Sequence, residues 1–207
     1  MWELFLAGGP VMWPLLLCSL VSLAVILERA YYWSRLDIIR DRNAVDRLLE
    51  IYRATGKAET GAESATGTTK GVVFRMLLSG IAHEGFSSAK AMEALALDEV
   101  RTMRRGMNIL DTIITIAPML GILGTVMGII TSFDMLGQSG VEDPKAVVSG
   151  IAEALITTAA GLMISVATVF PFNYFNARTE DAQDIFEHYG TRLEIVREDL
   201  QIGKRKS

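Results

Sequence analysis

Three long stretches of this sequence contain no Asp, Glu, Lys or Arg, and they constrain its fold more than any other feature. They cover residues 10–27, 112–133 and 154–177. Each reaches the roughly 18 to 20 residues that a helix needs to cross about 30 Å of hydrocarbon. Although 21% of the residues are charged, we therefore predict an all-α integral membrane protein with three transmembrane helices.

The first stretch could be mistaken for a secretory signal. No Lys or Arg precedes it, and the residues that follow, Glu28-Arg29-Ala30-Tyr31, do not form a small-residue cleavage site. We therefore expect a retained helix.

The positions of the basic residues predict the orientation of the chain. Twelve of the 20 Lys and Arg residues lie in 34–108 and six more lie in 178–207, whereas the 134–150 loop contains only Lys145. Because basic residues concentrate on the cytoplasmic side of a membrane, the amino terminus and the 134–150 loop should lie outside. The 34–108 loop and the 178–207 tail should lie in the cytoplasm.

Helical patterns also occur in the two predicted cytoplasmic segments. We predict helices over 36–54 and 72–105, with an interruption near 83–85, Ser87 or Ser88 as a helix cap, and a direct run from 99–105 into the second span. The Gly- and Thr-rich residues 55–71 indicate a mobile connection.

After the third span the helix should continue through the tail, because apolar residues recur at helical spacing. They are Ala182, Ile185, Phe186, Tyr189, Leu193, Val196 and Leu200. This stripe should pack on the loop helices as a cytoplasmic bundle, or alternatively join subunits. The six predicted segments are 1–33, 34–108, 109–133, 134–150, 151–177 and 178–207.

The sequence contains few residues suited to catalysis or metal binding. Cys18 is the single cysteine, and His83 and His188 are far apart and lack ligands at metal-binding spacing. No phosphate-binding, zinc or catalytic-triad motif occurs, and no basic patch with interleaved aromatics suggests nucleic acid. We expect no enzyme activity and no cofactor.

The second and third spans each gather small and polar residues on one helical face. These residues are Asp111, Thr115, Pro118, Gly121, Thr125, Gly128 and Ser132 in the second span, and Glu153, Thr157, Thr158, Gly161, Ser165 and Thr168 in the third. One interpretation is close helix packing, which Gly124-x-x-x-Gly128 also favours. The other is a polar path for an ion.

Glu153 favours the second interpretation. A carboxylate within a span costs roughly 2.5 kcal/mol or more unless it finds water, a partner or a proton. Beside Thr125, Thr157 and Thr158 it could take up a proton from outside and release it on rearrangement, with Asp111 passing it inward. Alternatively, Glu153 is an interfacial carboxylate and Asp111 a boundary residue solvated by headgroups.

Residues 117–128 (APMLGILGTVMG) and 150–155 (GIAEAL), with Thr158, Gly161 and Leu162, resemble the signatures of the ExbB/TolQ/MotA family of ion-channel subunits. Three spans, rather than four, resemble the ExbB/TolQ branch, and residues 8–14 (GGPVMWP) look ExbB-like.

The resemblance implies a bacterial inner-membrane proton channel subunit that converts proton-motive force into mechanical work for TonB-dependent transport. It implies a homopentameric ring whose second and third spans line a pore. An ExbD- or TolR-like single-span protein would occupy the pore, and a TonB- or TolA-like protein would carry force. Glu153 would be the pore acid, with Thr125 and Thr158 facing the pore.

Other functions remain open at this point. The chain could be a TolQ-like subunit of the Tol-Pal system, or a scaffold that clusters membrane proteins without conducting ions. A secondary transporter would usually show internal repeats and broken helices, which this chain does not.

Overall fold

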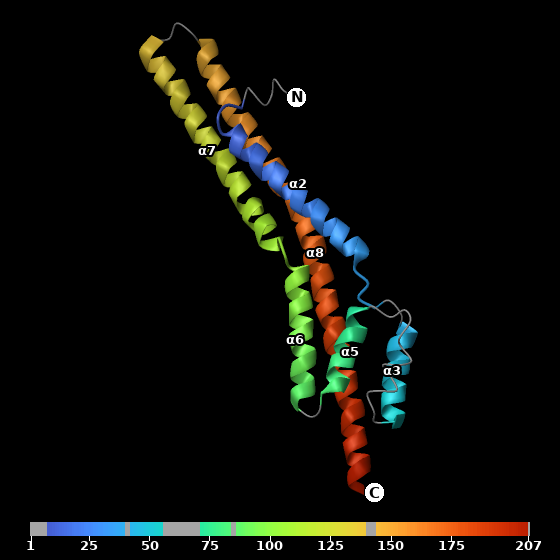
Figure 1. Cartoon of the computed structure of the whole chain (residues 1–207). Helices are drawn as coiled ribbons and strands as arrows, with labels where there is room; N and C mark the ends of the chain where they lie inside the picture. The colour runs from blue at the N-terminus through green and yellow to red at the C-terminus, as the bar shows by residue number, and fades with distance from the viewer. Residues whose placement is uncertain (1–7, 40–41, 56–70, 84–85, 140–143, 207) are drawn as a thin grey trace. The chain divides into compact units, whose positions relative to one another are not determined.

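The computed structural model describes residues 8–39, 42–55, 71–83, 86–139 and 144–206. The helices among them are α2 (Met12–Arg35), α3 (Arg42–Thr55), α5 (Val72–Ala82), α6 (Phe86–Met103), α7 (Met107–Ser139) and α8 (Pro144–Lys206), shown in Figure 1. Those ranges contain no β-strand, and the predicted all-α class is confirmed.

Three helical regions are long and apolar enough to cross a membrane, as the sequence predicts. They are Met12–Arg35, Ser87–Asp134 and Val148–Ile202. The last two contain the second and third predicted spans, and the first contains all but residues 10 and 11 of the first span. Proline lies inside two of the helices, at Pro118 in α7 and at Pro171 in α8. Membrane helices tolerate internal proline because neighbouring groups satisfy the backbone carbonyl that it leaves free.

The chain divides into two compact units. The membrane unit comprises Met1–Trp33 with Gly106–Asn176, and the second unit comprises Ser34–Arg105 with Ala177–Ser207. All three uncharged stretches fall in the membrane unit, apart from the last residue of the third. We describe each unit by itself.

In the membrane unit, α2 packs on α7 and α8 through two apolar clusters. The first cluster is centred on Val11, Leu15, Ile113 and Ala117, and the second on Met107, Leu110 and Phe175. The opposite helix faces carry large apolar side chains that remain exposed, including Leu17, Met119, Phe133, Met163 and Phe170. So many exposed apolar side chains are expected of a surface that meets lipid or other subunits.

The second unit buries its own core of large apolar side chains. α5 is buried along most of its length, and Leu77 and Val73 are fully enclosed. The predicted stripe on the tail packs inward, because Ala182, Phe186 and Leu193 are also buried. The tail helix therefore finds its partner helices within its own unit.

The prediction of a helix from residue 36 is wrong, because residues 36–39 are not helical and α3 begins at Arg42. The carbonyl of Ile38 instead accepts a hydrogen bond from the N–H of Val73, at 3.3 Å. Of the predicted mobile connection 55–71, Thr55 ends α3 and Gly71 precedes α5 in extended conformation. Its remaining residues lie outside the described part of the chain.

Two further predictions about local structure are wrong. Ser87 and Ser88 do not precede their helix, because α6 begins at Phe86, and the Ser88 hydroxyl donates to the carbonyl of Gly80 on α5 at 2.6 Å. The charged run 99–105 does not lead straight into the second span. A turn at residues 104–106 ends α6, and Gly106 adopts a positive φ of 78° there.

Candidate functional site

The centre of the membrane unit is the contact between α7 and α8, which is built from small residues. We call it the seam and define it by Ala117, Gly121, Gly124 and Gly128 on α7 and Gly150, Ala154, Thr157 and Gly161 on α8. A methyl group added at Gly161 would overlap the carbonyl oxygen of Ala117 and lie 3.2 Å from the Cα of Gly121. A methyl group at Gly128 would lie 2.9 Å from the carbonyl oxygen of Gly150. The two backbones therefore touch along the seam.

The pairing of these residues shows that α7 and α8 are antiparallel, as Figure 1 also shows. Gly161 meets Ala117 near the start of α7, whereas Gly150 meets Gly128 and Ser132 near its end. In this register Glu153 lies one residue before Ala154, whose carbonyl oxygen is 3.2 Å from the Thr125 hydroxyl. The structure thus gathers Thr125, Thr157, Thr158 and Glu153 in one part of the seam.

Hydroxyl groups join the two helices at this level. The hydroxyls of Thr125 and Thr158 form a short hydrogen bond with each other. Thr158 also donates to the carbonyl of Gly121 at 3.0 Å, and Thr125 lies 3.2 Å from the carbonyl oxygen of Ala154. Further along the seam, Ser165 donates to the carbonyl of Ile114 at 2.8 Å. Close approach and interhelical hydrogen bonds are the interactions that hold helices together in lipid.

The predicted packing residues divide into two groups. Gly121, Gly124, Gly128 and Gly161 all lie in the seam, where helix packing within one chain accounts for their small size. Pro118 is half-buried beside Ala117, which is the residue that meets Gly161. Thr157 is also enclosed, with its hydroxyl donating to the carbonyl of Ala154 at 2.8 Å.

Glu153 is the acid beside the seam residue Ala154. Its side chain is half-buried, and within the described part of the chain its carboxylate forms no hydrogen bond or ion pair. The backbone of Gly9, at the turn before α2, lies directly against it. A Cβ on Gly9 would lie 2.7 Å from the carboxyl carbon of Glu153 and would overlap its Oε1.

Asp111 is exposed near the start of α7, and the structure does not bring it to Glu153. In the seam Ala154 meets Gly128, which is 17 residues after Asp111, so the two acids are separated by about 25 Å of helix at 1.5 Å per residue. The backbone carbonyl of Asp111 accepts a hydrogen bond from Thr115 at 3.2 Å. Its predicted part in passing a proton inward stays a prediction.

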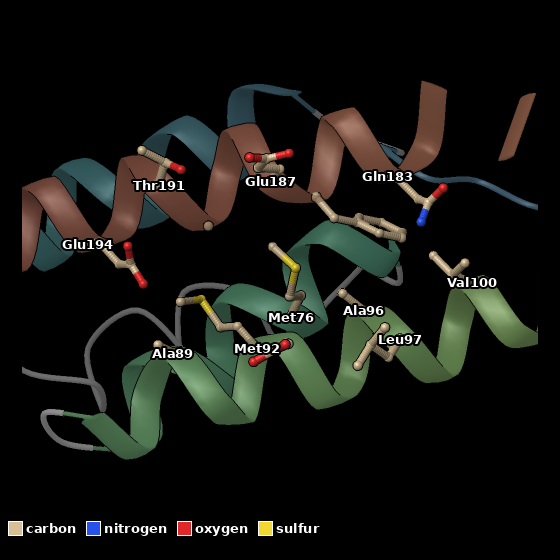
Figure 2. A pocket seen from close by; sticks show the side chains of 13 residues that line it. Met76, Ala89, Met92, Ala96, Leu97, Val100, Gln183, Glu187, Thr191 and Glu194 are labelled. Carbon is tan, nitrogen blue, oxygen red and sulfur yellow. The ribbon is translucent and has the colours of Figure 1, made fainter. Parts of the chain in front are cut away.

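The second unit contains a groove of 450 Å³ between α5, α6 and α8 (Figure 2). Met76 and Met92 lie within it, and the acidic side chains of Glu93, Glu187 and Glu194 line it. Figure 2 shows α6 and α8 on either side of the labelled side chains. The groove lies in the second unit, and its lining residues fall outside the three uncharged stretches of the sequence.

The described residues contain no group of three or more His, Cys, Asp or Glu that could hold a metal ion. Cys18 is a free, half-buried thiol. The ring nitrogen Nδ1 of His83 lies 2.8 Å from the carbonyl oxygen of Ser79, and the ring of His188 packs edge-on against Tyr189. His83 and His188 thus each contact a neighbouring residue of their own helix region.

The described residues form an all-α fold with three helices apolar enough to cross a membrane, and two of these join along a small-residue seam with Glu153 beside it. This is the architecture of a multi-span membrane-protein subunit. A family model described as the MotA/TolQ/ExbB proton channel family matches residues 69–188. The chain belongs to this family.

Relatives named for biopolymer transport agree with this assignment. ExbB-like 1 of Synechocystis sp. is 41% identical over 93% of this chain and 77% of its own length. ExbB-like 3 of the same organism is 34% identical over 83% of each chain. Biopolymer transport protein exbB1 of Vibrio cholerae is 27% identical over 78% of this chain and 72% of its own length.

Sequence reasoning missed two features of the membrane unit. The contact of Gly9 with Glu153 joins residues 144 positions apart, and only the double glycine before Pro10 hinted at a special turn. No sequence pattern indicated that Arg29 would be buried, yet it is among the most buried side chains of the described residues. It pairs with Glu28, and its guanidinium lies 4.8 Å from the centre of the Tyr32 ring.

Proposed function

We propose that this protein is the proton-conducting subunit of an ExbB-like inner-membrane motor and that Glu153 is its proton-binding acid. The observation that carries the proposal is the position of Glu153. It is a half-buried carboxylate one residue before Ala154, whose carbonyl oxygen is 3.2 Å from the Thr125 hydroxyl, and among the described residues it forms no hydrogen bond or ion pair. A carboxylate within a membrane span costs free energy unless it finds water, a partner or a proton, so proton uptake and release at Glu153 would change the charge of the site.

The exposed apolar faces of α2, α7 and α8 support assembly into a larger complex. We propose a homo-oligomeric ring, a pentamer by family resemblance, around an ExbD- or TolR-like single-span partner. A TonB- or TolA-like protein would then transmit the force. We further propose a periplasmic amino terminus and a cytoplasmic carboxyl terminus, which the positions of the basic residues support.

Proton flow would supply the energy for this work. Each charge that moves down the membrane potential releases about 2.3 kcal/mol per 100 mV. Each protonation change also alters the electrostatic interaction of Glu153 with an acid on the partner. Successive changes around a ring would therefore favour stepwise movement of the partner.

The test is proton flux driven by a pH gradient into liposomes that contain this protein and its single-span partner. We expect Glu153→Gln to abolish flux while the complex still assembles, because the amide cannot exchange a proton at this position. Asp134→Asn is the matched control, since Asp134 is an exposed acid on α7 outside the seam. It should conduct like the wild type.

The main rival is a scaffold that conducts nothing and only clusters membrane proteins. A scaffold would not need an acid at Glu153, so it predicts that Glu153→Ala has no effect on function in cells. Flux in Glu153→Gln at the wild-type level would contradict the proposed function. A TolQ-like role in the same family would retain the dependence on Glu153 and differ only in which partner restores flux.

A further inference from the structure

The amino-terminal turn before α2 contacts the acid to which we assign proton binding. We propose that Gly9 is a positioning residue for Glu153, whose bare Cα forms one wall of the space that holds the carboxylate. The contact between Gly9 and the carboxylate does not depend on the proposed function. Its consequence for conduction rests on the proposed function. The family match begins at residue 69, so it assigns Gly9 no role.

Two independent features restrict position 9 to glycine. Its φ is +66°, a conformation that residues with a Cβ rarely adopt. The direction in which a Cβ would point is already occupied by the Oε1 of Glu153, and its carboxyl carbon lies 2.7 Å from that Cβ position. Glycine therefore allows the backbone to approach the acid more closely than any other residue could.

Hydrogen bonds and packing fix this turn in place. The carbonyl of Gly9 accepts from the N–H of Met12 at 3.2 Å, and that of Pro10 accepts from Trp13 at 3.3 Å. Directly after the turn, Val11 and Leu15 are buried in the apolar cluster that joins α2 to α7. The wall beside Glu153 is thus anchored to the core of the membrane unit.

A side chain at position 9 would move the acid without separating the helices. The overlap falls on the end of a flexible side chain, so rotation of Glu153 relieves it. By contrast, a methyl group in the seam, as at Gly161, meets backbone atoms that cannot rotate away. Replacement of Gly9 should therefore displace the carboxylate and leave the seam intact.

The test uses the full chain reconstituted in liposomes with its single-span partner. Two quantities are measured for Gly9→Ala: proton flux, and the rate at which dicyclohexylcarbodiimide labels Glu153, followed by mass spectrometry. We expect flux to fall about tenfold or more, because misplacing a reacting group by about 1 Å can cost as much as 10²-fold. We expect the labelling rate to change as well, because the carboxylate occupies a new position.

Gly106→Ala is the matched control for backbone strain. Gly106 has a similar φ of +78°, but a Cβ there would meet Val25 at 3.0 Å rather than an acid. It should leave the labelling rate of Glu153 unchanged. Gly9→Asn provides a second variant, because asparagine tolerates positive φ and still places a Cβ against the carboxylate. If position 9 mattered only because of its positive φ, Gly9→Asn would restore the wild-type labelling rate.

Shortening the acid gives a rescue experiment. Aspartate is one methylene shorter than glutamate, so its carboxylate withdraws from a Cβ at position 9. Gly9→Ala combined with Glu153→Asp should therefore conduct better than the product of the two single effects predicts.

The proposal is wrong if Gly9→Ala and Gly9→Asn label Glu153 at the rate of Gly106→Ala. If Gly9→Ala fails to assemble, the labelling rate of Glu153 in Gly9→Asn decides whether the proposal holds. Failure of the proposed function is a separate result: Glu153→Gln would then conduct like the wild type, while the labelling rates would still decide whether Gly9 positions the acid.

Discussion

The seam of the membrane unit and the α5–α6–α8 region of the second unit pack helices in opposite ways. In the seam, glycines bring backbones into contact, and no space remains for a methyl group at Gly161. In the second unit, large side chains such as Met76, Leu77 and Leu193 fill the interior, and a groove of 450 Å³ lies beside them. The helix contact in the seam leaves no room for larger side chains, whereas helix packing in the second unit depends on large side chains.

These two kinds of packing gain stability from different interactions. Lipid tails are as apolar as leucine, so helices in a membrane gain stability from close approach and interhelical hydrogen bonds. A unit with a core of large side chains, such as the second unit, gains stability from burying apolar area, at about 25 cal/mol per Å². The seam should therefore be damaged by adding atoms, and the second unit by removing them.

The largest effect should come from removing atoms in the second unit. Leu77 on α5 is fully buried. Leu77→Ala loses the transfer free energy of the deleted atoms and leaves a cavity, which should cost about 3 kcal/mol. Thermal unfolding in detergent, followed by circular dichroism, measures this loss. A change no greater than that of the exposed Leu97→Ala would contradict the comparison.

The next largest effect should come from adding a single methyl group to the seam. Gly161→Ala forces α8 against the backbone of Ala117, and overpacking of this kind costs about 1–3 kcal/mol. The measurement is the loss of helicity on titration with sodium dodecyl sulfate in mixed micelles. Stability equal to that of the wild type would show that the seam can open freely.

Removing the interhelical hydroxyls should have a smaller effect. Thr125→Val and Thr158→Val keep the shape of the side chain, and each should cost about 1 kcal/mol in the same titration. Because the two hydroxyls bond to each other, the double variant should cost less than the sum of the single variants. If the stability losses of the two single variants simply add in the double variant, the hydrogen bond between the two hydroxyls does not contribute to stability.

The smallest effect should have the opposite sign. A Cβ at Gly190 on α8, beside the groove, or at Gly137 on α7 would meet nothing within 4 Å. Glycine inside a helix costs about 0.5–1 kcal/mol relative to alanine, so Gly190→Ala and Gly137→Ala should each stabilise by that amount. Gly137 lies on the same helix as the seam glycines. Destabilisation there would show that the membrane unit resists alanine wherever it is placed.

Much of the fold was predictable because its strongest signals are local. Uncharged stretches long enough to cross a membrane, and the stripe through Ala182, Phe186 and Leu193, each depend on residues near in sequence. The errors arose where distant residues compete for backbone groups. Ile38 bonds to Val73 rather than continuing a helix, and the Ser88 hydroxyl reaches Gly80 rather than capping its own helix.

The candidate site was predictable to the same extent. Helical periodicity placed Thr125, Thr158 and Glu153 on facing stripes, and the antiparallel register of α7 and α8 brings Thr125 against Thr158 and against the carbonyl oxygen of Ala154, next to Glu153. The contact of Gly9 with Glu153 could not be predicted, because no local pattern specifies which helix end meets which acid. Whether Glu153 conducts is a matter for the flux experiment.

The hydroxyl groups of the seam have a consequence for the kind of ion that the site can accept. Each hydroxyl has a single hydrogen, and those of Ser165, Thr157 and Thr158 are directed at backbone carbonyls. What such a hydroxyl still presents is oxygen lone pairs. Lone pairs solvate positive charge and repel negative charge, so if Glu153 binds a proton as proposed, the nearby hydroxyls of Thr157 and Thr158 favour a hydronium or metal cation over chloride.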